Sequence, residues 1–137
     1  MIEHAIKLRV RYAEVDRMGY VYYGNYATYF EVARVETLRS LGVTYKELED
    51  GGIILPVVDF AIKYLKPAFY DDELTIKTTV KKNPTARIGF DFETKNNAGE
   101  LLNTSTVTLV FANRETGKPC MPPDFLREKF DKCFMSN

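Results

Sequence analysis

The sequence predicts an α+β domain in which an antiparallel five-stranded sheet wraps around one long helix. Three observations carry this prediction. Residues 25–42 repeat apolar side chains at helical spacing over about four turns, and on more than one face. One alternating, strand-like segment precedes this helix, and four such segments follow it in succession. A sheet with one apolar face and a single apolar helix bury each other when the sheet curls around the helix.

The first two elements are a half-buried strand and the long helix. In residues 4–11, apolar side chains alternate with basic ones, which is typical of a strand with one buried face. In the helix, Asn25 is the expected N-cap and Gly42 the expected C-terminal stop. Ion pairs at i,i+3 spacing are expected on its surface, Glu31 with Arg34 and Glu36 with Arg39.

The remaining elements follow in chain order. Thr44 and Glu47 form a capping-box pattern, so a short second helix is predicted over residues 43–50. The four further strands are predicted at residues 54–66, 73–82, 86–94 and 101–111, followed by a closing helix at residues 124–134. Turn-like segments separate the strands, which predicts an antiparallel meander with one apolar face. For residues 54–66 that apolar face is expected to contain Val58, Phe60, Ile62 and Tyr64.

Composition narrows the class of protein. The chain has 137 residues, enough for one domain that buries roughly two-thirds of its unfolded surface. Its 19 basic and 19 acidic residues form no basic stripe, so nucleic acid is not an expected partner. No apolar segment is long enough to cross a membrane or to serve as a signal peptide, so a cytoplasmic location is expected. Cys120 and Cys133 are then expected to be reduced.

The segment from Arg11 to Tyr26 is the strongest candidate for chemistry. It joins the first strand to the long helix and contains Asp16, two glycines and five tyrosines. Free backbone N–H groups at a helix start carry partial positive charge, so they bind anions and polarise carbonyl groups. A carboxylate and such amides at one junction can act together on a carbonyl group.

The chain resembles the hotdog-fold thioesterases, and more narrowly the 4-hydroxybenzoyl-CoA thioesterase and acyl-CoA thioester hydrolase branch. The resemblance covers nearly the whole chain. It implies one hotdog domain over residues 1–137 that hydrolyses a small to medium acyl- or aroyl-CoA thioester without a metal or redox cofactor. The matching residues are Arg11-Tyr12, Asp16, Gly19, Val21-Tyr22, Tyr26, Phe30-Glu31, Ala33-Arg34 and the segment from Tyr64 to Asp72.

The resemblance assigns the catalytic carboxylate to Asp16, whereas position alone also fits a solvated turn residue. Asp16 would attack the thioester carbonyl as a nucleophile or activate water as a general base. Backbone amides of Tyr23, Gly24 or Asn25 would stabilise the oxyanion, with Tyr23 favoured by the resemblance. A common variant of the family has histidine at the position of Tyr23.

Other residues are weaker candidates. Tyr12 would orient Asp16 or the acyl group, or would simply pack as an aromatic residue. Gly19 and Gly24 would allow the backbone to turn tightly next to the substrate, and Val21 would contact it. Glu31 is a rival carboxylate, although a surface ion pair is the simpler role, and Asp59 is a weaker rival.

A cationic rim is expected for the phosphates of coenzyme A. Lys82 and Arg87 are the preferred candidates, because they flank the turn at Asn83-Pro84. Lys63, Lys66 and Lys81 are secondary candidates. A solvated turn is the alternative explanation for all of these charges.

The resemblance also implies a homodimer, often assembled into a tetramer, with the active site between two subunits. Two other functions remain open: hydrolysis of acyl carrier protein thioesters, and acyl-CoA binding without catalysis. His4 is the only histidine, which disfavours a Ser-His-Asp hydrolase and a histidine-dependent dehydratase. One histidine and two distant cysteines do not predict a metal site.

Overall fold

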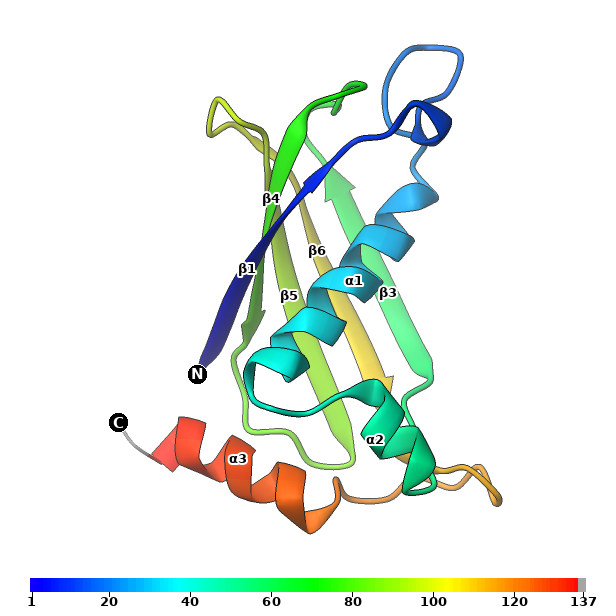
Figure 1. The fold of residues 1–137 in the computed structure, drawn as a ribbon, viewed down its shortest axis with the longest axis vertical. Coiled ribbons are helices and arrows are strands. Elements are labelled where there is room, and N and C mark those ends of the chain that lie inside the picture. Colours follow the sequence, from blue (N-terminus) through cyan, green and yellow to red (C-terminus); the bar gives the residue numbers. More distant parts are fainter. Residues whose placement is uncertain (136–137) are drawn as a thin grey trace.

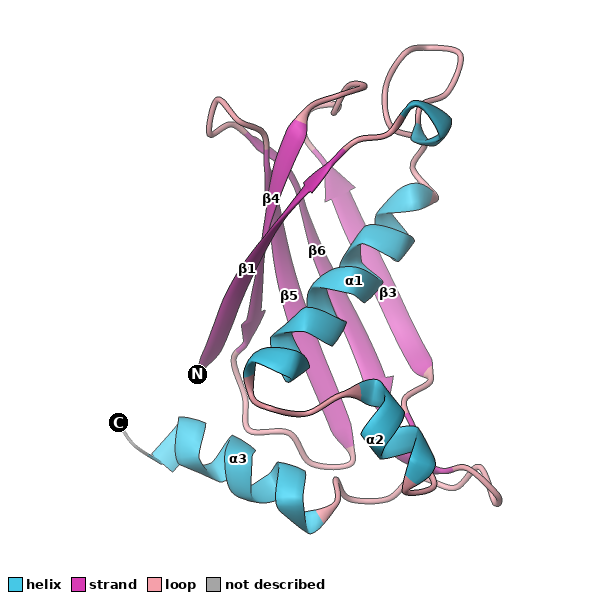
Figure 2. Cartoon of the chain, viewed as in Figure 1, coloured by secondary structure: helices cyan, strands magenta, loops and turns pink. Residues whose placement is uncertain are grey.

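The computed structural model describes residues 1–135 and contains a five-stranded antiparallel sheet of order β1-β4-β5-β6-β3. One long helix, α1 (Asn25–Ser40), lies across one face of this sheet (Figures 1 and 2). The predicted fold class is confirmed. The strands of the sheet are β1 (Ile2–Arg9), β3 (Val57–Tyr64), β4 (Glu73–Val80), β5 (Arg87–Lys95) and β6 (Leu101–Val110).

Shorter elements surround this framework. A 3-10 turn, η1 (Tyr12–Glu14), follows β1, and α2 (Tyr45–Asp50) follows α1. A second, two-stranded sheet pairs β2 (Ile53–Ile54) with β7 (Ala112–Asn113). The last helix is α3 (Asp124–Met135). Figure 1 shows α2 and α3 at the end of the sheet opposite to the loop that leads into α1.

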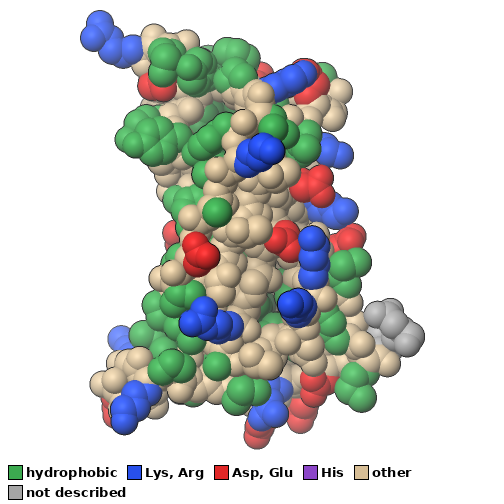
Figure 3. Space-filling view, turned by 180° about the vertical axis from the view of Figure 1, so that it is seen from behind, with side chains coloured by type: hydrophobic (Ala, Val, Ile, Leu, Met, Phe, Trp, Pro, Cys, Tyr) green, Lys and Arg blue, Asp and Glu red, His purple; other side chains and the backbone are tan. Residues whose placement is uncertain are grey.

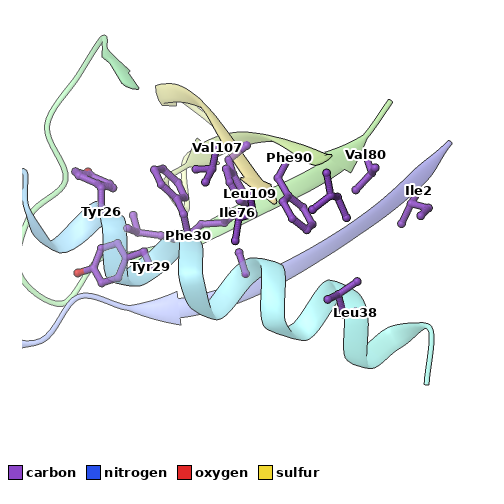
Figure 4. Close-up of a cluster of buried hydrophobic side chains, with 14 of the residues drawn as sticks. Ile2, Tyr26, Tyr29, Phe30, Leu38, Ile76, Val80, Phe90, Val107 and Leu109 are labelled. Atoms are coloured by element: carbon purple, nitrogen blue, oxygen red, sulfur yellow. The ribbon is translucent and has the colours of Figure 1, made fainter. Parts of the chain in front are cut away.

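The core lies between α1 and the sheet. Figure 4 shows buried side chains of the helix meeting those of the strands. Phe30 stacks on Phe92 of β5 with ring centroids 4.7 Å apart, and Phe92 stacks on Phe90. Fully burying each such side chain stabilises the fold by about 1.5–3 kcal/mol. The alternation predicted for residues 86–94 therefore identifies the face that packs against the helix.

The sheet order differs from the predicted meander. Strands β4, β5 and β6 do follow one another as antiparallel neighbours. However, β3 pairs with β6, and β1 occupies the position beside β4. The segment between β3 and β4, residues 65–72, is long enough to cross from one edge region of the sheet to the other. The expectation that β3 pairs with β4, the next strand along the chain, is therefore wrong.

Strand β3 is exposed where the sequence predicted burial. It is an edge strand, and Val58, Phe60 and Tyr64 are 47%, 40% and 47% exposed. The segment predicted as one strand over residues 54–66 is also split, because Leu55 and Pro56 separate β2 from β3. An exposed apolar edge of this kind is unusual for a monomer, because it offers unpaired backbone groups to other chains.

The helix ends correct one prediction and confirm two. Helix α1 begins at Asn25 rather than after it, and the Asn25 side chain donates to the carbonyl of Glu14 at 2.8 Å instead of capping the helix. Gly42 follows the helix with φ +86°, as expected of a stop. Thr44 caps α2 by accepting from the Glu47 amide at 3.1 Å.

Of the two ion pairs expected on α1, one is present. Glu36 and Arg39 are 3.2 Å apart. Among residues 1–135, Glu31 and Arg34 form no ion pair within 4.0 Å, and Arg34 is buried while Glu31 is exposed. The outer face of the sheet has charges of both signs, and hydrophobic groups lie along the edge formed by β3 (Figure 3). No helix within the described residues is long and apolar enough to span a membrane, and both cysteines are free thiols.

Candidate active site

A cavity of about 440 Å³ lies where the loop after η1 meets the start of α1 and the segment that follows β3. Three residues predicted from the sequence line it together: Asp16, Val21 and Tyr23. The loop is fixed to the opposite wall, because the Val21 amide donates to the carbonyl of Ala68 at 2.9 Å. The full lining is Asp16, Met18, Tyr20, Val21, Tyr23, Tyr26, Tyr64, Leu65, Lys66, Pro67 and Ala68.

Asp16 begins a closed turn. Its backbone amide donates to the carbonyl of Tyr20 at 3.0 Å, and its carbonyl accepts from the Gly19 amide at 3.0 Å. Gly19 adopts φ +88°, which a residue with a side chain rarely does. The carboxylate atom Oδ1 accepts from the Met18 amide at 2.9 Å, whereas Oδ2 accepts from no group in residues 1–135. One carboxylate oxygen is therefore fixed, and the other can act on a substrate in the cavity.

The start of α1 provides two free amides. The Asn25 amide donates to the carbonyl of Tyr22 at 2.9 Å, and the Tyr26 amide donates to the carbonyl of Tyr23 at 3.2 Å. In the part of the chain that is described, the amides of Tyr23 and Gly24 have no acceptor. These two N–H groups lie at the positive end of the helix and match what an oxyanion requires. The amide of Asn25, one of the three expected oxyanion donors, is therefore excluded, because it already donates to the Tyr22 carbonyl.

Gly24 is favoured by the space beside Tyr22 rather than by its backbone angle. Its φ of −62° is open to any residue, but a Cβ atom there would lie 2.7 Å from Cε2 of Tyr22. The Tyr22 ring would have to move to admit it. Gly24 therefore keeps the aromatic ring close to the first amides of the helix.

Aromatic rings form one side of the cavity. Tyr26 and Tyr64 meet edge to face with centroids 5.9 Å apart. Burial, and secondarily the nearby Tyr64, raise the pKa of Tyr26 to about 12, so its hydroxyl group is neutral and can donate near pH 7. Apolar and aromatic surface beside a few polar groups is typical of a site for an uncharged organic group.

Of the other predicted residues, Gly19, Gly24 and Asn25 lie in the adjoining loop and helix start without lining the cavity, and Tyr12 and Glu31 do not line it either. Tyr12 is 77% exposed in η1 and packs edge to face on Tyr70 with centroids 5.4 Å apart. Glu31 lines a separate groove of about 220 Å³ between α1 and β3, together with Arg34 and Phe60. Within one chain neither Tyr12 nor Glu31 lines the cavity with Asp16. The catalytic role of Tyr12 and the substrate-binding role of Glu31 stay predictions.

Lys82 and Arg87 lie at the far end of the sheet. They flank the turn after β4, whose last residue Val80 pairs with Ile2 at the beginning of β1. The Asp16 loop follows the other end of β1, where Arg9 pairs with Glu73. Within one chain these two cations are therefore remote from the cavity. Lys66 lines the cavity instead and forms an ion pair with Glu100.

Sequence reasoning missed several residues of the site. Residues 64–68 line the cavity together with the Asp16 loop, although the two segments are far apart in the chain. Periodicity within either segment does not indicate that they meet. The one available signal was that the segment from Tyr64 to Asp72 belongs to the family resemblance. Glu14 was also missed, although it lies three residues after Arg11 and two before Asp16.

The fold and this cavity define a thioesterase-like protein, and comparison with known families agrees. Residues 10–130 match the model of the thioesterase-like superfamily. The match spans most of the chain, and the chain belongs to this superfamily. The resemblance to hotdog-fold thioesterases noted from the sequence is thereby confirmed.

Individual relatives are similar over most of their length. DHNA-CoA thioesterase from Staphylococcus aureus has a solved structure that aligns with a TM-score of 0.94 and 37% identity, covering 98% of this chain and 93% of that one. The YneP protein of Bacillus subtilis is 34% identical over 113 residues, which is 82% of each chain. The acyl-CoA thioesterase YbgC of Haemophilus influenzae is 32% identical over 124 residues, or 90% of each chain.

Proposed function

We propose that this protein is an acyl-CoA thioesterase that hydrolyses small to medium acyl- or aroyl-CoA thioesters, with Asp16 as its catalytic carboxylate. One observation carries the assignment of the site. A carboxylate with a free oxygen and a residue whose backbone amide is free at a helix start, Tyr23, line the same cavity. The thioesterase relatives at 32–37% identity support the class of reaction.

Two routes use this geometry, and both consume one water molecule. In the first, Oδ2 of Asp16 attacks the carbonyl carbon, the C–S bond breaks, and coenzyme A leaves as the thiol after protonation. Water then hydrolyses the acyl–aspartyl anhydride to the free acid and restores the carboxylate. In the second, Asp16 accepts a proton from the water molecule that attacks the carbonyl directly. The tetrahedral intermediate then loses its C–S bond, and the leaving thiolate takes up that proton to give coenzyme A and the free acid. In both routes the tetrahedral oxyanion binds the amides of Tyr23 and Gly24.

The apolar edge of β3 supports a homodimer as the working unit. Antiparallel pairing of β3 with the same strand of a second copy would satisfy its unpaired backbone groups and cover Val57, Val58 and Phe60. The two sheets would then form one continuous sheet. The groove that contains Glu31 opens beside this edge, so a second copy would complete its wall.

Such a dimer would also explain the position of Lys82 and Arg87. A two-fold axis at an antiparallel strand pair turns the second copy end for end. The Lys82 turn of one copy would then lie at the same end as the Asp16 cavity of the other. We propose that Lys82 and Arg87 bind coenzyme A phosphates held at the partner's cavity. A cytoplasmic location fits an acyl-CoA substrate, and cell fractionation tests it.

The decisive experiment measures thiol release from a panel of acyl-CoA, aroyl-CoA and acyl carrier protein thioesters. Asp16→Asn is expected to lower kcat/KM at least about 100-fold on the best substrate, because it removes both nucleophile and base. Asp71→Asn is the matched control. Asp71 is an exposed carboxylate with φ +69°, a conformation that asparagine also tolerates, so wild-type activity is expected.

Each result of the panel is informative. Wild-type activity in Asp16→Asn would contradict the mechanism. Cleavage of no thioester, combined with tight binding of acyl-CoA, would make the protein a binding module. A clear preference for acyl carrier protein thioesters would replace the substrate class and leave the role of Asp16 intact.

A further inference from the structure

Glu14 has an unusual position for a residue outside the cavity. Its side chain is only 11% exposed, although it lies in a short turn at the surface end of β1. The next residue but one is Asp16. In the proposed mechanism this half-buried carboxylate has no role of its own.

The backbone carbonyl of Glu14 joins the turn to the start of α1. It accepts from the Tyr22 amide at 2.9 Å and from Nδ2 of Asn25 at 2.8 Å. These two donors stand on either side of Tyr23 and Gly24, whose amides are free. The position of Glu14 therefore determines where the two free amides lie relative to Asp16.

The side chain of Glu14 fixes that position from a second direction. Oε1 accepts from the Arg11 amide at 2.7 Å and from the Tyr29 hydroxyl at 2.9 Å. Oε2 accepts from Nη2 of Arg11 at 3.1 Å and from Nε at 3.3 Å. Tyr29 is buried in α1, one helical turn beyond the free amides. The carboxylate thus ties the turn before Asp16 to the body of the helix.

Charge in this cluster agrees with the geometry. Burial by itself raises the pKa of Glu14, but the hydrogen bonds from Arg11 and Tyr29 outweigh burial and leave the pKa below its usual value. Glu14 is therefore an anion wherever the protein works near neutral pH. Burial, and then the bond to Glu14, raise the pKa of Tyr29, which remains a neutral donor.

We propose that Glu14 is a positioning residue for thioester hydrolysis, an inference that rests on the proposed function. Its side chain and carbonyl keep Asp16 and the amides of Tyr23 and Gly24 at the separation that one thioester carbonyl requires. It touches neither substrate nor reacting atoms. Small misplacement of catalytic groups lowers rates strongly, and it acts on the chemical step more than on binding.

The test compares kcat and KM for Glu14→Ala, Glu14→Gln and Glu36→Ala with wild type. Glu14→Ala is expected to lower kcat about 10- to 100-fold with KM changed less than about threefold. Glu14→Gln keeps an acceptor oxygen for Tyr29 or Arg11, so most of the rate should return. Glu36→Ala is the matched control, because Glu36 also pairs with an arginine at i,i+3 spacing but contacts neither the loop nor the cavity.

A second readout separates positioning from simple stabilisation. All variants are assayed well below their melting temperatures, and kcat and KM are determined separately for each. In Glu14→Ala kcat is expected to fall while KM is nearly kept, and Glu14→Gln is expected to restore most of kcat, whereas a purely structural role would change only the melting temperature. A lower melting temperature with unchanged kcat would overturn the proposal.

Tyr29→Phe covers the case in which Glu14→Ala does not fold. It deletes one bond to the carboxylate and keeps the buried ring, so kcat should fall about threefold or more. Wild-type kcat in this variant would overturn the proposal. Asp16→Asn separates the two ideas. If that variant is active, the proposed function fails. If it is inactive while the Glu14 and Tyr29 variants match wild type, only the positioning role fails.

Discussion

At the scale of single residues, the turn that begins at Asp16 depends on Gly19. Its φ of +88° lies in the left-handed region, where a side chain costs about 1–2 kcal/mol. Space is not the difficulty, because a Cβ atom at this position would meet no atom within 4 Å. The strain would act on the turn that fixes the carboxylate of Asp16.

Gly19→Ala is therefore expected to lower both stability and activity. Its free energy of unfolding should fall by about 1–2 kcal/mol, measured by denaturant titration. Gly89→Ala is the control, since Gly89 lies in β5 with open space around it and an ordinary backbone conformation. Equal effects of the two substitutions would contradict the importance of the Gly19 backbone.

Single residues also show how far the sequence could predict the site. Asp16, Val21 and Tyr23 were assigned from the junction and the family resemblance, and they do line one cavity. Asn25 was expected to cap α1, but its side chain donates to the Glu14 carbonyl instead. That contact joins the start of the helix to η1, and the sequence pattern around Asn25 does not indicate it. A sequence pattern predicts contacts between residues close together in the chain, whereas Glu14 contacts Asn25 and Ala68 contacts Val21 across longer separations.

At the scale of elements, a substitution at the cap of α2 should lower stability and leave catalysis unchanged. Thr44→Ala removes the side chain that accepts from the Glu47 amide, at a cost of about 1 kcal/mol. Helix α2 lies at the end of the molecule away from the cavity (Figure 1). Thermal melting should show the loss, and kcat at a temperature well below the transition should equal that of wild type.

Strand β3 is the element for which the sequence was most misleading. Its alternating pattern indicated an apolar face, but not that Val58, Phe60 and Tyr64 would be exposed on an edge strand. An edge strand and a central strand can have the same period of two. Neighbouring strands in sequence were also expected to pair, although β3 pairs with β6.

The proposed dimer makes a clear prediction at this edge. Val58→Lys places a charge on exposed β3, so it should shift the protein from dimer to monomer in sedimentation velocity and lower activity with it. Met135→Lys is the control at another exposed apolar side chain, at the last residue of α3, which lies across the molecule from β3 (Figure 1). An unchanged dimer in Val58→Lys would show that subunits associate through a different surface.

At the scale of the whole molecule, buried tyrosines are expected to set the alkaline limit of stability. The pKa of Tyr26 is raised to about 12 and that of Tyr29 is also raised. A raised pKa means that the folded state favours the neutral form. The stabilisation is complete below pH 10 and is lost as pH rises through the folded pKa.

The melting temperature should therefore fall between about pH 10 and pH 12. Tyr26 alone should account for a loss of about 2 kcal/mol in the free energy of unfolding. Tyr26→Phe should have a shallower decline over this interval, and Tyr70→Phe, at an exposed ring, should follow wild type. A decline of the same slope in Tyr26→Phe would assign the alkaline limit to other groups.

The placement of Asp16 and Arg87 at opposite ends of one chain has a genetic consequence. In a two-fold pair, each site would draw its carboxylate from one copy and its phosphate-binding cations from the other. An Asp16→Asn allele and an Arg87→Ala allele, each defective alone, would then compensate when expressed together, because half of the sites in a mixed pair are intact. Interallelic complementation of this kind would make heterozygous cells competent where either homozygote is not.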